Sequence, residues 1–247
     1  MMEQTIEVTR SDDRVVVRLN RREARNAINQ QMVDELHRVC AELEVEPRIL
    51  IITGSDGVFA SGADIAELRE RTSVDARKGI NTMLLLRIAD LAMPVIAAID
   101  GPALGAGAEL AYAADFRIGT PRVRIGNPET GLGIIAAAGA LWRLPELVGE
   151  PLAKQMLLAG RILDAEEAAT ARLLTEIVEP GELLGAAHAL ADEIATKSVA
   201  ATIRTKALLR GDRGRHPQAD LDAQAVLFDS DDKRERMTAF LNRKKKN

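Results

Sequence analysis

The sequence predicts an α/β core followed by a helical C-terminal section. Short apolar runs rich in β-branched residues, such as Val95–Ile99, have the length of buried strands. Segments with helical spacing of apolar residues lie between these runs, and beyond Asn127 the patterns indicate only loops and helices. Hydrophobic residues make up 47% and charged residues 28% of the 247-residue chain, which is typical of one large globular domain, or one domain plus an appendage.

The first part of the chain alternates strands and helices. Residues 5–9 and 14–19 alternate apolar and polar side chains, which predicts two strands joined by a turn at Ser11-Asp12-Asp13. Asn29 is a suitable N-cap for a helix whose apolar stripe runs from Met32 to Leu43. The other elements expected here are a buried strand at 48–53, a helix from Ile65 to about Arg71, and a helix at 78–92.

The second part begins with strands and becomes helical. We expect strands at 95–99, 116–119 and 123–125, and then helices at 139–148, 151–159, 164–173, 186–197, 199–210, 219–228 and 231–243. This pattern predicts two regions, an α/β core over residues 1–190 and a helical C-terminal region over residues 191–247.

Composition and charge exclude several classes of function. The net charge of −4 argues against general nucleic-acid binding, and the basic residues 243–246 are typical of a solvated tail. Cys40 is the single cysteine, which excludes an internal disulfide and a cysteine-rich metal site, and the three histidines show no metal-ligand spacing. No apolar run is long enough to cross a bilayer, and the N-terminus lacks the features of a signal peptide. We therefore expect a cytoplasmic protein without a metal.

The segment 94–114 contains the strongest functional signal. A buried strand ends at Gly101-Pro102, and a turn of glycine and alanine at 105–108 leads into a helix that contains Glu109. The first N–H groups of a helix lack intrahelical partners, so this turn is suited to stabilise an oxygen that gains negative charge. The alternative is structural, since an acidic residue in a first turn also complements the helix dipole.

A second segment repeats this design. Ser61-Gly62-Ala63-Asp64-Ile65 follows a strand, a glycine and a loop, as Ala106-Gly107-Ala108-Glu109-Leu110 does. Two strand–turn–helix units of one design can direct their turn amides at one pocket.

Five segments together resemble the enoyl-CoA hydratase/isomerase, or crotonase, family. They occur in the family's order and cover essentially the whole chain: Asn20-Arg21 with Asn26-Ala27-Ile28, residues 59–64, residues 94–115, residues 126–133, and Leu158-Ala159-Gly160 with residues 165–168. The resemblance implies a crotonase-like spiral of ββα units with a helical C-terminal trimerisation region, and hence a homotrimer or a dimer of trimers.

The same resemblance implies a chemistry and a set of site residues. Members bind acyl-CoA thioesters and stabilise a thioester enolate, with CoA as part of the substrate and no separate cofactor. By motif position, the resemblance implies that the oxyanion amides are those of Ala63 and Ala106, and that Asp64 and Ile65 belong to the same oxyanion and substrate-binding site. Hydratases of the family use two glutamates, which correspond to Glu109 and Glu129. Adding water requires taking a proton from water and delivering one to carbon, and two carboxyl groups in different roles can do this.

Several positions differ from the hydratase pattern. Alanines at 136–138 and Ala140 replace a glycine-rich wall on the water side of the pocket, and Thr130-Gly131 replaces a more apolar pair. A lysine that is frequent near CoA is replaced by Ala66, which leaves Arg22 and Arg25 as candidates for the CoA phosphates. Retention of both glutamates favours enoyl-CoA hydration. The alternatives are double-bond isomerisation on the same fold, or an inactive relative that binds acyl-CoA or RNA.

Overall fold

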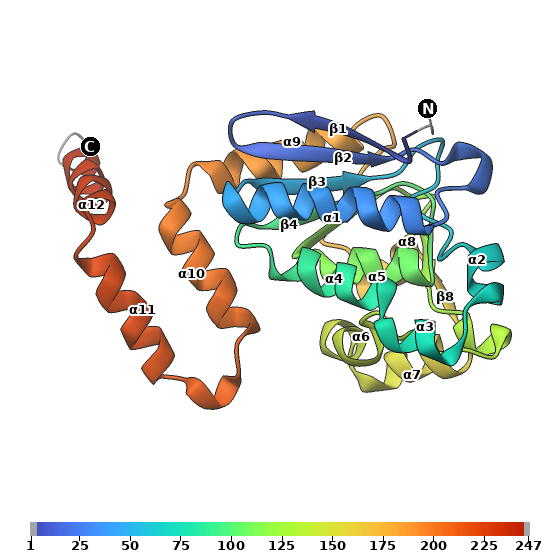
Figure 1. Cartoon of the computed structure of the whole chain (residues 1–247). Coiled ribbons are helices and arrows are strands. Elements are labelled where there is room, and N and C mark those ends of the chain that lie inside the picture. The colour runs from blue at the N-terminus through green and yellow to red at the C-terminus, as the bar shows by residue number, and fades with distance from the viewer. Residues whose placement is uncertain (1–3, 245–247) are drawn as a thin grey trace. The chain divides into compact units, whose positions relative to one another are not determined.

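The computed structural model describes residues 4–244, which form two compact units that divide between Ala191 and Asp192 (Figure 1). The larger unit contains a six-stranded sheet in the order β1-β2-β3-β4-β6-β9. Its strands are β1 (Ile6–Arg10), β2 (Arg14–Leu19), β3 (Ile49–Thr53), β4 (Val95–Ile99), β6 (Phe116–Gly119) and β9 (Glu176–Ile177). The pair β1 and β2 is antiparallel, and the other neighbours are parallel. Every residue of β3 and β4 is buried, which explains their unbroken apolar sequences.

A second, smaller sheet begins directly after β4 along the chain, and the loops that follow its strands contribute to the site. It has three strands in the order β5 (Pro102–Leu104), β7 (Arg124–Gly126) and β8 (Ile162–Asp164). The strand β7 is parallel to β5 and antiparallel to β8.

The helices of the larger unit pack in a continuous series, α1 on α4, α4 on α5, α5 on α6 and α6 on α7. The helices within this unit are α1 (Gln30–Val45), α2 (Ile65–Glu70), α3 (Ser73–Lys78), α4 (Ile80–Asp90), α5 (Ala106–Ala113), α6 (Ala140–Val148), α7 (Glu150–Leu158) and α8 (Ala165–Thr170). The helix α9 (Leu183–Ala195) crosses the boundary between the two units. All eight residues of α5 are buried. A Cβ atom on Gly107 would lie 2.3 Å from the carbonyl oxygen of Ala60, so the close approach of α5 to that loop requires glycine.

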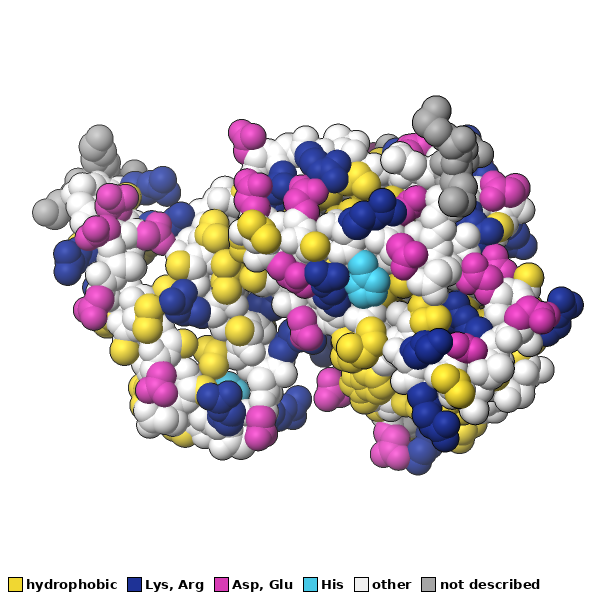
Figure 2. All heavy atoms as spheres, viewed as in Figure 1, with side chains coloured by type: hydrophobic (Ala, Val, Ile, Leu, Met, Phe, Trp, Pro, Cys, Tyr) yellow, Lys and Arg dark blue, Asp and Glu magenta, His cyan; other side chains and the backbone are white. Residues whose placement is uncertain are grey.

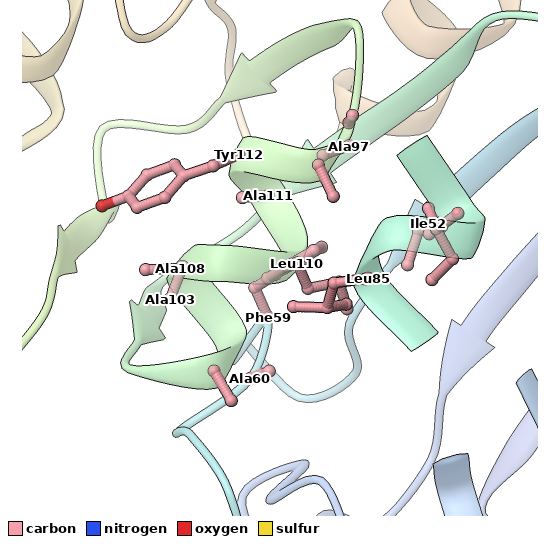
Figure 3. Packing of buried hydrophobic residues seen from close by; sticks show 14 of the residues in the cluster. Ile52, Phe59, Ala60, Leu85, Ala97, Ala103, Ala108, Leu110, Ala111 and Tyr112 are labelled. Atoms are coloured by element: carbon pink, nitrogen blue, oxygen red, sulfur yellow. The ribbon is translucent and has the colours of Figure 1, made fainter. Parts of the chain in front are cut away.

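The hydrophobic core is built around α5. Leu110 lies beside Phe59 and Leu85 in the packed interior (Figure 3), and both of these side chains are almost completely buried. The rigid core therefore holds the first turn of α5 in a fixed place.

The C-terminal unit contains α10 (Val199–Arg210), α11 (Gln218–Phe228) and α12 (Asp231–Lys244). Hydrophobic side chains lie at its surface (Figure 2). The large exposed ones are Val199, Leu209, Leu221, Val226, Phe228, Met237, Phe240 and Leu241. Within residues 4–244, no helix has the length and apolar character needed to cross a membrane.

Several short elements differ from the sequence expectation, among them the strand β5, which was not expected. Beyond Asn127 the structure contains the strands β8 and β9, so the expectation of loops and helices alone was wrong. With three and two residues, these strands are too short for an alternation signal, and they form because neighbouring strands offer backbone partners. The helix α3 was also not expected. It begins at a capping box, in which the Thr72 side chain accepts from the backbone N–H of Asp75 and the Asp75 side chain accepts from the backbone N–H of Thr72.

Candidate active site

A cavity of about 560 Å³ opens where the turns before α2 and α5 meet the loop after β7. Ala63, Ala106 and Glu129 all line it. The lining also includes residues of α2, α3, the start of α4 and the segment after Glu129, among them Ile65, Leu68, Arg71, Asn81, Thr82 and Ile135. The two strand–turn–helix units are joined directly, because Ala60 and Ala103 pair in a parallel bridge and Leu104 donates its N–H to the Ala60 carbonyl at 3.0 Å.

The first turn leaves the N–H of Ala63 available. On one side Ile28 donates its N–H to the Gly62 carbonyl at 2.8 Å, and on the other side Asp64 donates to the Ile28 carbonyl at 3.0 Å. These bonds fix the turn, and the N–H of Ala63 between them has no hydrogen-bond partner among residues 4–244. Gly62 has a φ of 121°, a conformation that favours glycine.

The second turn leaves the N–H of Ala106 available in the same way. Ala106 is the first residue of α5, where the helix cannot provide a partner for this group. Gly105 precedes it with φ 53° and ψ −125°, and the Gly105 N–H bonds the Gly126 carbonyl of β7 at 2.9 Å. In the described part of the chain the N–H of Ala106 has no partner. Two residues that line the cavity therefore have backbone N–H groups without a partner among residues 4–244.

Glu129 places a carboxyl group at the cavity. It begins a short 3₁₀-helix, η2 (Glu129–Leu132), and 9% of its surface is exposed. Its Oε1 accepts a hydrogen bond from Nδ2 of Asn127 at 3.2 Å, whereas its buried Oε2 has no partner. Burial raises the pKa of Glu129, against the opposing effect of the backbone and Asn127 hydrogen bonds.

Glu109 lies deeper than Glu129. It is 2% exposed and does not line the cavity, whereas Ala138, whose N–H bonds it, does. Both hydrogen bonds of the Glu109 carboxylate end on Oε1, from the N–H of Ala138 at 2.7 Å and of Ala140 at 3.1 Å. Burial raises its pKa to about 7, and the charge of Glu129 adds to this rise, while the two amides and Arg143 oppose it. The alanine-rich segment therefore holds Glu109 with its backbone.

The other predicted residues have different surroundings. Ile65 lines the cavity with 56% of its surface exposed. Asp64 caps α2 by accepting from the N–H of Ala66 at 3.0 Å, and it pairs with Arg21 at 3.1 Å, so its carboxylate has a structural role in this turn. Arg22 bonds the Asn20 side chain at 3.0 Å. The exposed guanidinium of Arg25 has no partner among the described residues, and neither Arg22 nor Arg25 lines the cavity.

Sequence reasoning missed several residues at this site. Asn81 and Thr82, at the start of α4, line the cavity, and Oδ1 of Asn81 is buried without a hydrogen-bond partner. Tyr112 and Asn127 are buried beside Glu129 and connect to it by hydrogen bonds. For Asn81, Thr82 and Tyr112 the available signal was a polar group inside an otherwise apolar segment, and Asn127 gave no such signal. Within residues 4–244, no group of three or more histidine, cysteine, aspartate or glutamate residues is placed to hold a metal ion.

Comparison with known proteins identifies the family. Residues 11–247 match the sequence profile of the enoyl-CoA hydratase/isomerase family. The chain is 36% identical to a short-chain-enoyl-CoA hydratase of Clostridium acetobutylicum, over 93% of this chain and 92% of the relative. It is also 36% identical to a crotonyl-CoA hydratase of Syntrophomonas wolfei, over 100% and 98% of the two chains. The chain belongs to the enoyl-CoA hydratase/isomerase family.

Solved structures agree with this assignment. The crystal structure of an enoyl-CoA hydratase from Bacillus anthracis matches with a TM-score of 0.92 at 30% identity, covering 97% of each chain. Pseudomonas aeruginosa DspI matches with a TM-score of 0.91 at 30% identity, over 98% of this chain and 95% of that one. The expected fold class, an α/β crotonase-like spiral with a helical C-terminal region, is confirmed.

Proposed function

We propose that this protein is an enoyl-CoA hydratase that adds water to a 2-enoyl-CoA thioester. The observation that carries the proposal is the meeting of two unpaired N–H groups, of Ala63 and Ala106, with the carboxyl group of Glu129 at one cavity. The relatives named as hydratases of short-chain enoyl-CoA and crotonyl-CoA support the same substrate class.

The two amides bind the oxygen of the thioester carbonyl. Attack of water on the β-carbon pushes an electron pair into the thioester, and the charge that develops on its oxygen is stabilised by both N–H groups. One donor in such an arrangement contributes about 3–4 kcal/mol to the stability of a charged transition state. Because both donors belong to fixed turns, they need little reorganisation during the reaction.

The two glutamates handle the protons. The water oxygen forms the new bond to the β-carbon, one water proton goes to an ionised carboxylate, and the α-carbon takes a proton from a protonated carboxyl group. The pKa of Glu109 is raised to about 7 and that of Glu129 is also raised, so the pair holds a proton near neutral pH. Oε2 of each glutamate is the oxygen available for transfer, because the protein's hydrogen bonds end on Oε1.

The second candidate is double-bond isomerisation of a 3-enoyl-CoA, in which one carboxylate moves a proton between two carbons. Its support is that Glu129 lines the cavity whereas Glu109 does not. A single carboxylate beside the acyl chain is enough for this reaction.

Mixing the protein with crotonyl-CoA distinguishes the two reactions. Hydration removes the ultraviolet absorbance of the conjugated thioester, whereas isomerisation creates it from a 3-enoyl-CoA. Glu109→Gln and Glu129→Gln should each reduce hydration by at least about 10²-fold, with acyl-CoA binding largely kept. Wild-type turnover in either variant would remove that residue from the mechanism, and no loss of absorbance with wild-type protein would overturn the hydratase proposal.

Two further features complete the proposal. Arg25 has the free guanidinium expected of a CoA phosphate contact, and Arg22 is the second candidate although Asn20 already binds it. The exposed apolar side chains of the C-terminal helices, such as Leu221 and Phe228, support association into a homotrimer or a dimer of trimers.

A further inference from the structure

A buried chain of hydrogen bonds leads from α5 to Glu129. The hydroxyl group of Tyr112 donates to Oδ1 of Asn127 at 3.0 Å. Nδ2 of Asn127 donates to Oε1 of Glu129 at 3.2 Å and to the carbonyl of Gly105 at 3.4 Å. Tyr112 is 3% exposed and Asn127 is 1% exposed. The ring of Tyr112 extends away from the core side chains Leu110 and Leu85 (Figure 3).

Tyr112 and the carbonyl of Gly105 together hold the amide of Asn127 in one orientation. An asparagine side chain has a carbonyl oxygen at one end and an NH₂ group at the other, so its hydrogen-bond partners decide its orientation. Burial, and then the charges of Glu109 and Glu129, raise the pKa of Tyr112 far above its usual range, so its hydroxyl remains a donor. The carbonyl of Gly105 can only accept, so the NH₂ group of Asn127 faces Gly105 and Glu129, and its Oδ1 faces the Tyr112 hydroxyl, which donates to it.

The amide in turn selects one oxygen of Glu129. Oε1 is held by Asn127 and lies against Gly105, where an added Cβ would be only 3.1 Å from it. Oε2 is left without a partner, although it is buried on a residue that lines the cavity. Asn127 also contacts Gly105, the residue before the Ala106 amide. One side chain therefore links the Glu129 carboxyl group to the turn that carries the second backbone donor.

We propose that Tyr112 and Asn127 are positioning residues that fix the carboxyl group of Glu129 with Oε2 directed at the substrate and Oε1 bound to the protein. This inference rests on the proposed role of Glu129 in hydration. It predicts that removing the Tyr112 hydroxyl affects turnover through two intervening hydrogen bonds, although Tyr112 does not line the cavity.

The chain also controls the charge of Glu129. The NH₂ group of Asn127 favours the ionised carboxylate, and a reversed amide would present an oxygen that disfavours it. The other charged groups around this cluster are Glu109 of α5, Arg117 of β6 and Arg143 of α6. The variants below leave all of these in place, so a change in the pH dependence of Tyr112→Phe reports the Asn127 contact, whereas Asn127→Asp also adds a carboxyl group beside Glu129.

The test compares Tyr112→Phe and Asn127→Asp with the matched control Thr53→Val. Thr53 is a buried core residue whose hydroxyl donates to the Ala98 carbonyl at 2.9 Å, so its variant also loses one buried hydroxyl bond, but away from the cavity. Tyr112→Phe should lower kcat for crotonyl-CoA by roughly 10- to 100-fold with little change in KM, as expected for a misplaced reacting group. Asn127→Asp should move the kcat/KM pH profile upward by about one pH unit or more, because a like charge raises the Glu129 pKa. Thr53→Val should leave kcat and the profile unchanged.

Glu129→Gln separates the two possible failures. If Glu129→Gln is inactive while Tyr112→Phe and Asn127→Asp keep wild-type kcat and pH profile, the positioning role is overturned and the proposed function stands. If Glu129→Gln turns over normally, the proposed role of Glu129 fails and this inference fails with it. Circular dichroism checks folding, and Tyr112→Phe keeps the ring, so it supplies the decisive kinetics even where Asn127→Asp does not fold. A kcat loss of equal size in Thr53→Val would also overturn the positioning role.

Discussion

Replacing Glu109 by glutamine should stabilise the protein while it removes activity. The neutral side chain keeps an oxygen that can accept from the N–H groups of Ala138 and Ala140. Burial raises the pKa of Glu109 from 4.5 to about 7. One pKa unit corresponds to about 1.4 kcal/mol, so ionised Glu109 destabilises the folded state by about 3 kcal/mol. The folded state holds the Glu109 proton more tightly than the unfolded state does. The stability that the protein has while Glu109 is protonated is therefore lost as the pH rises from about 4.5 to about 7.

Urea unfolding followed by circular dichroism at pH 5 and pH 8 measures the effect. At pH 8 Glu109→Gln should gain about 3 kcal/mol, or roughly 6–12 °C in Tm, and most of the gain should disappear at pH 5. Glu42→Gln is the control of opposite sign, because hydrogen bonding to Arg10 lowers the pKa of Glu42 and the variant loses that pairing. A Glu109→Gln protein that is no more stable than wild type at pH 8 would refute the reasoning that burying the ionised carboxylate of Glu109 destabilises the folded state.

Four further results are expected. Ala106→Pro should keep its circular dichroism and lose at least about 10²-fold in turnover, because proline is tolerated at a first helical position but has no N–H. The controls Ala106→Gly and Val199→Pro, the latter at the start of α10, should stay active. A folded, active Ala106→Pro protein would contradict the role of this turn. Gly105→Ala should lower kcat, since its Cβ would approach Oε1 of Glu129 to 3.1 Å at a φ of 53°, and unchanged kcat would count against this packing. Arg25→Ala should raise KM for crotonyl-CoA without lowering kcat, and an unchanged KM at low salt would exclude a phosphate contact. Light scattering at micromolar concentration should give the mass of a trimer or a hexamer, and a monomer mass would contradict the proposed assembly.

The central strands and the main turn were predictable from sequence for a physical reason. Strands buried on both faces have continuous apolar sequences, which identified Val95–Ile99 and the strand ending at Thr53. The N-cap Asn29 also acts locally, by accepting from the N–H of Met32 at 3.0 Å. Features that depend on neighbouring residues in the chain can be recognised in the sequence.

Features that depend on distant partners could not be predicted in this way. Glu109 bonds the backbone of Ala138 and Ala140, 29 and 31 residues away, and backbone donors leave no signature in side-chain identity. The sequence placed the alanine-rich segment at the wall of the pocket, and the structure shows that its backbone also binds a carboxylate. The contact of Tyr112 with Asn127 likewise depends on how α5 and the end of β7 meet.

The most direct test of hydration at this cavity is to incubate wild-type protein with crotonyl-CoA in water enriched in the heavy oxygen isotope. Mass spectrometry of the product should find one labelled oxygen at the β-carbon of a 3-hydroxyacyl-CoA, and Glu109→Gln and Glu129→Gln should form this product at least about 10²-fold more slowly. A product that has gained no oxygen, or equal labelling by both variants, would contradict the proposal that the two glutamates add water to the bound thioester.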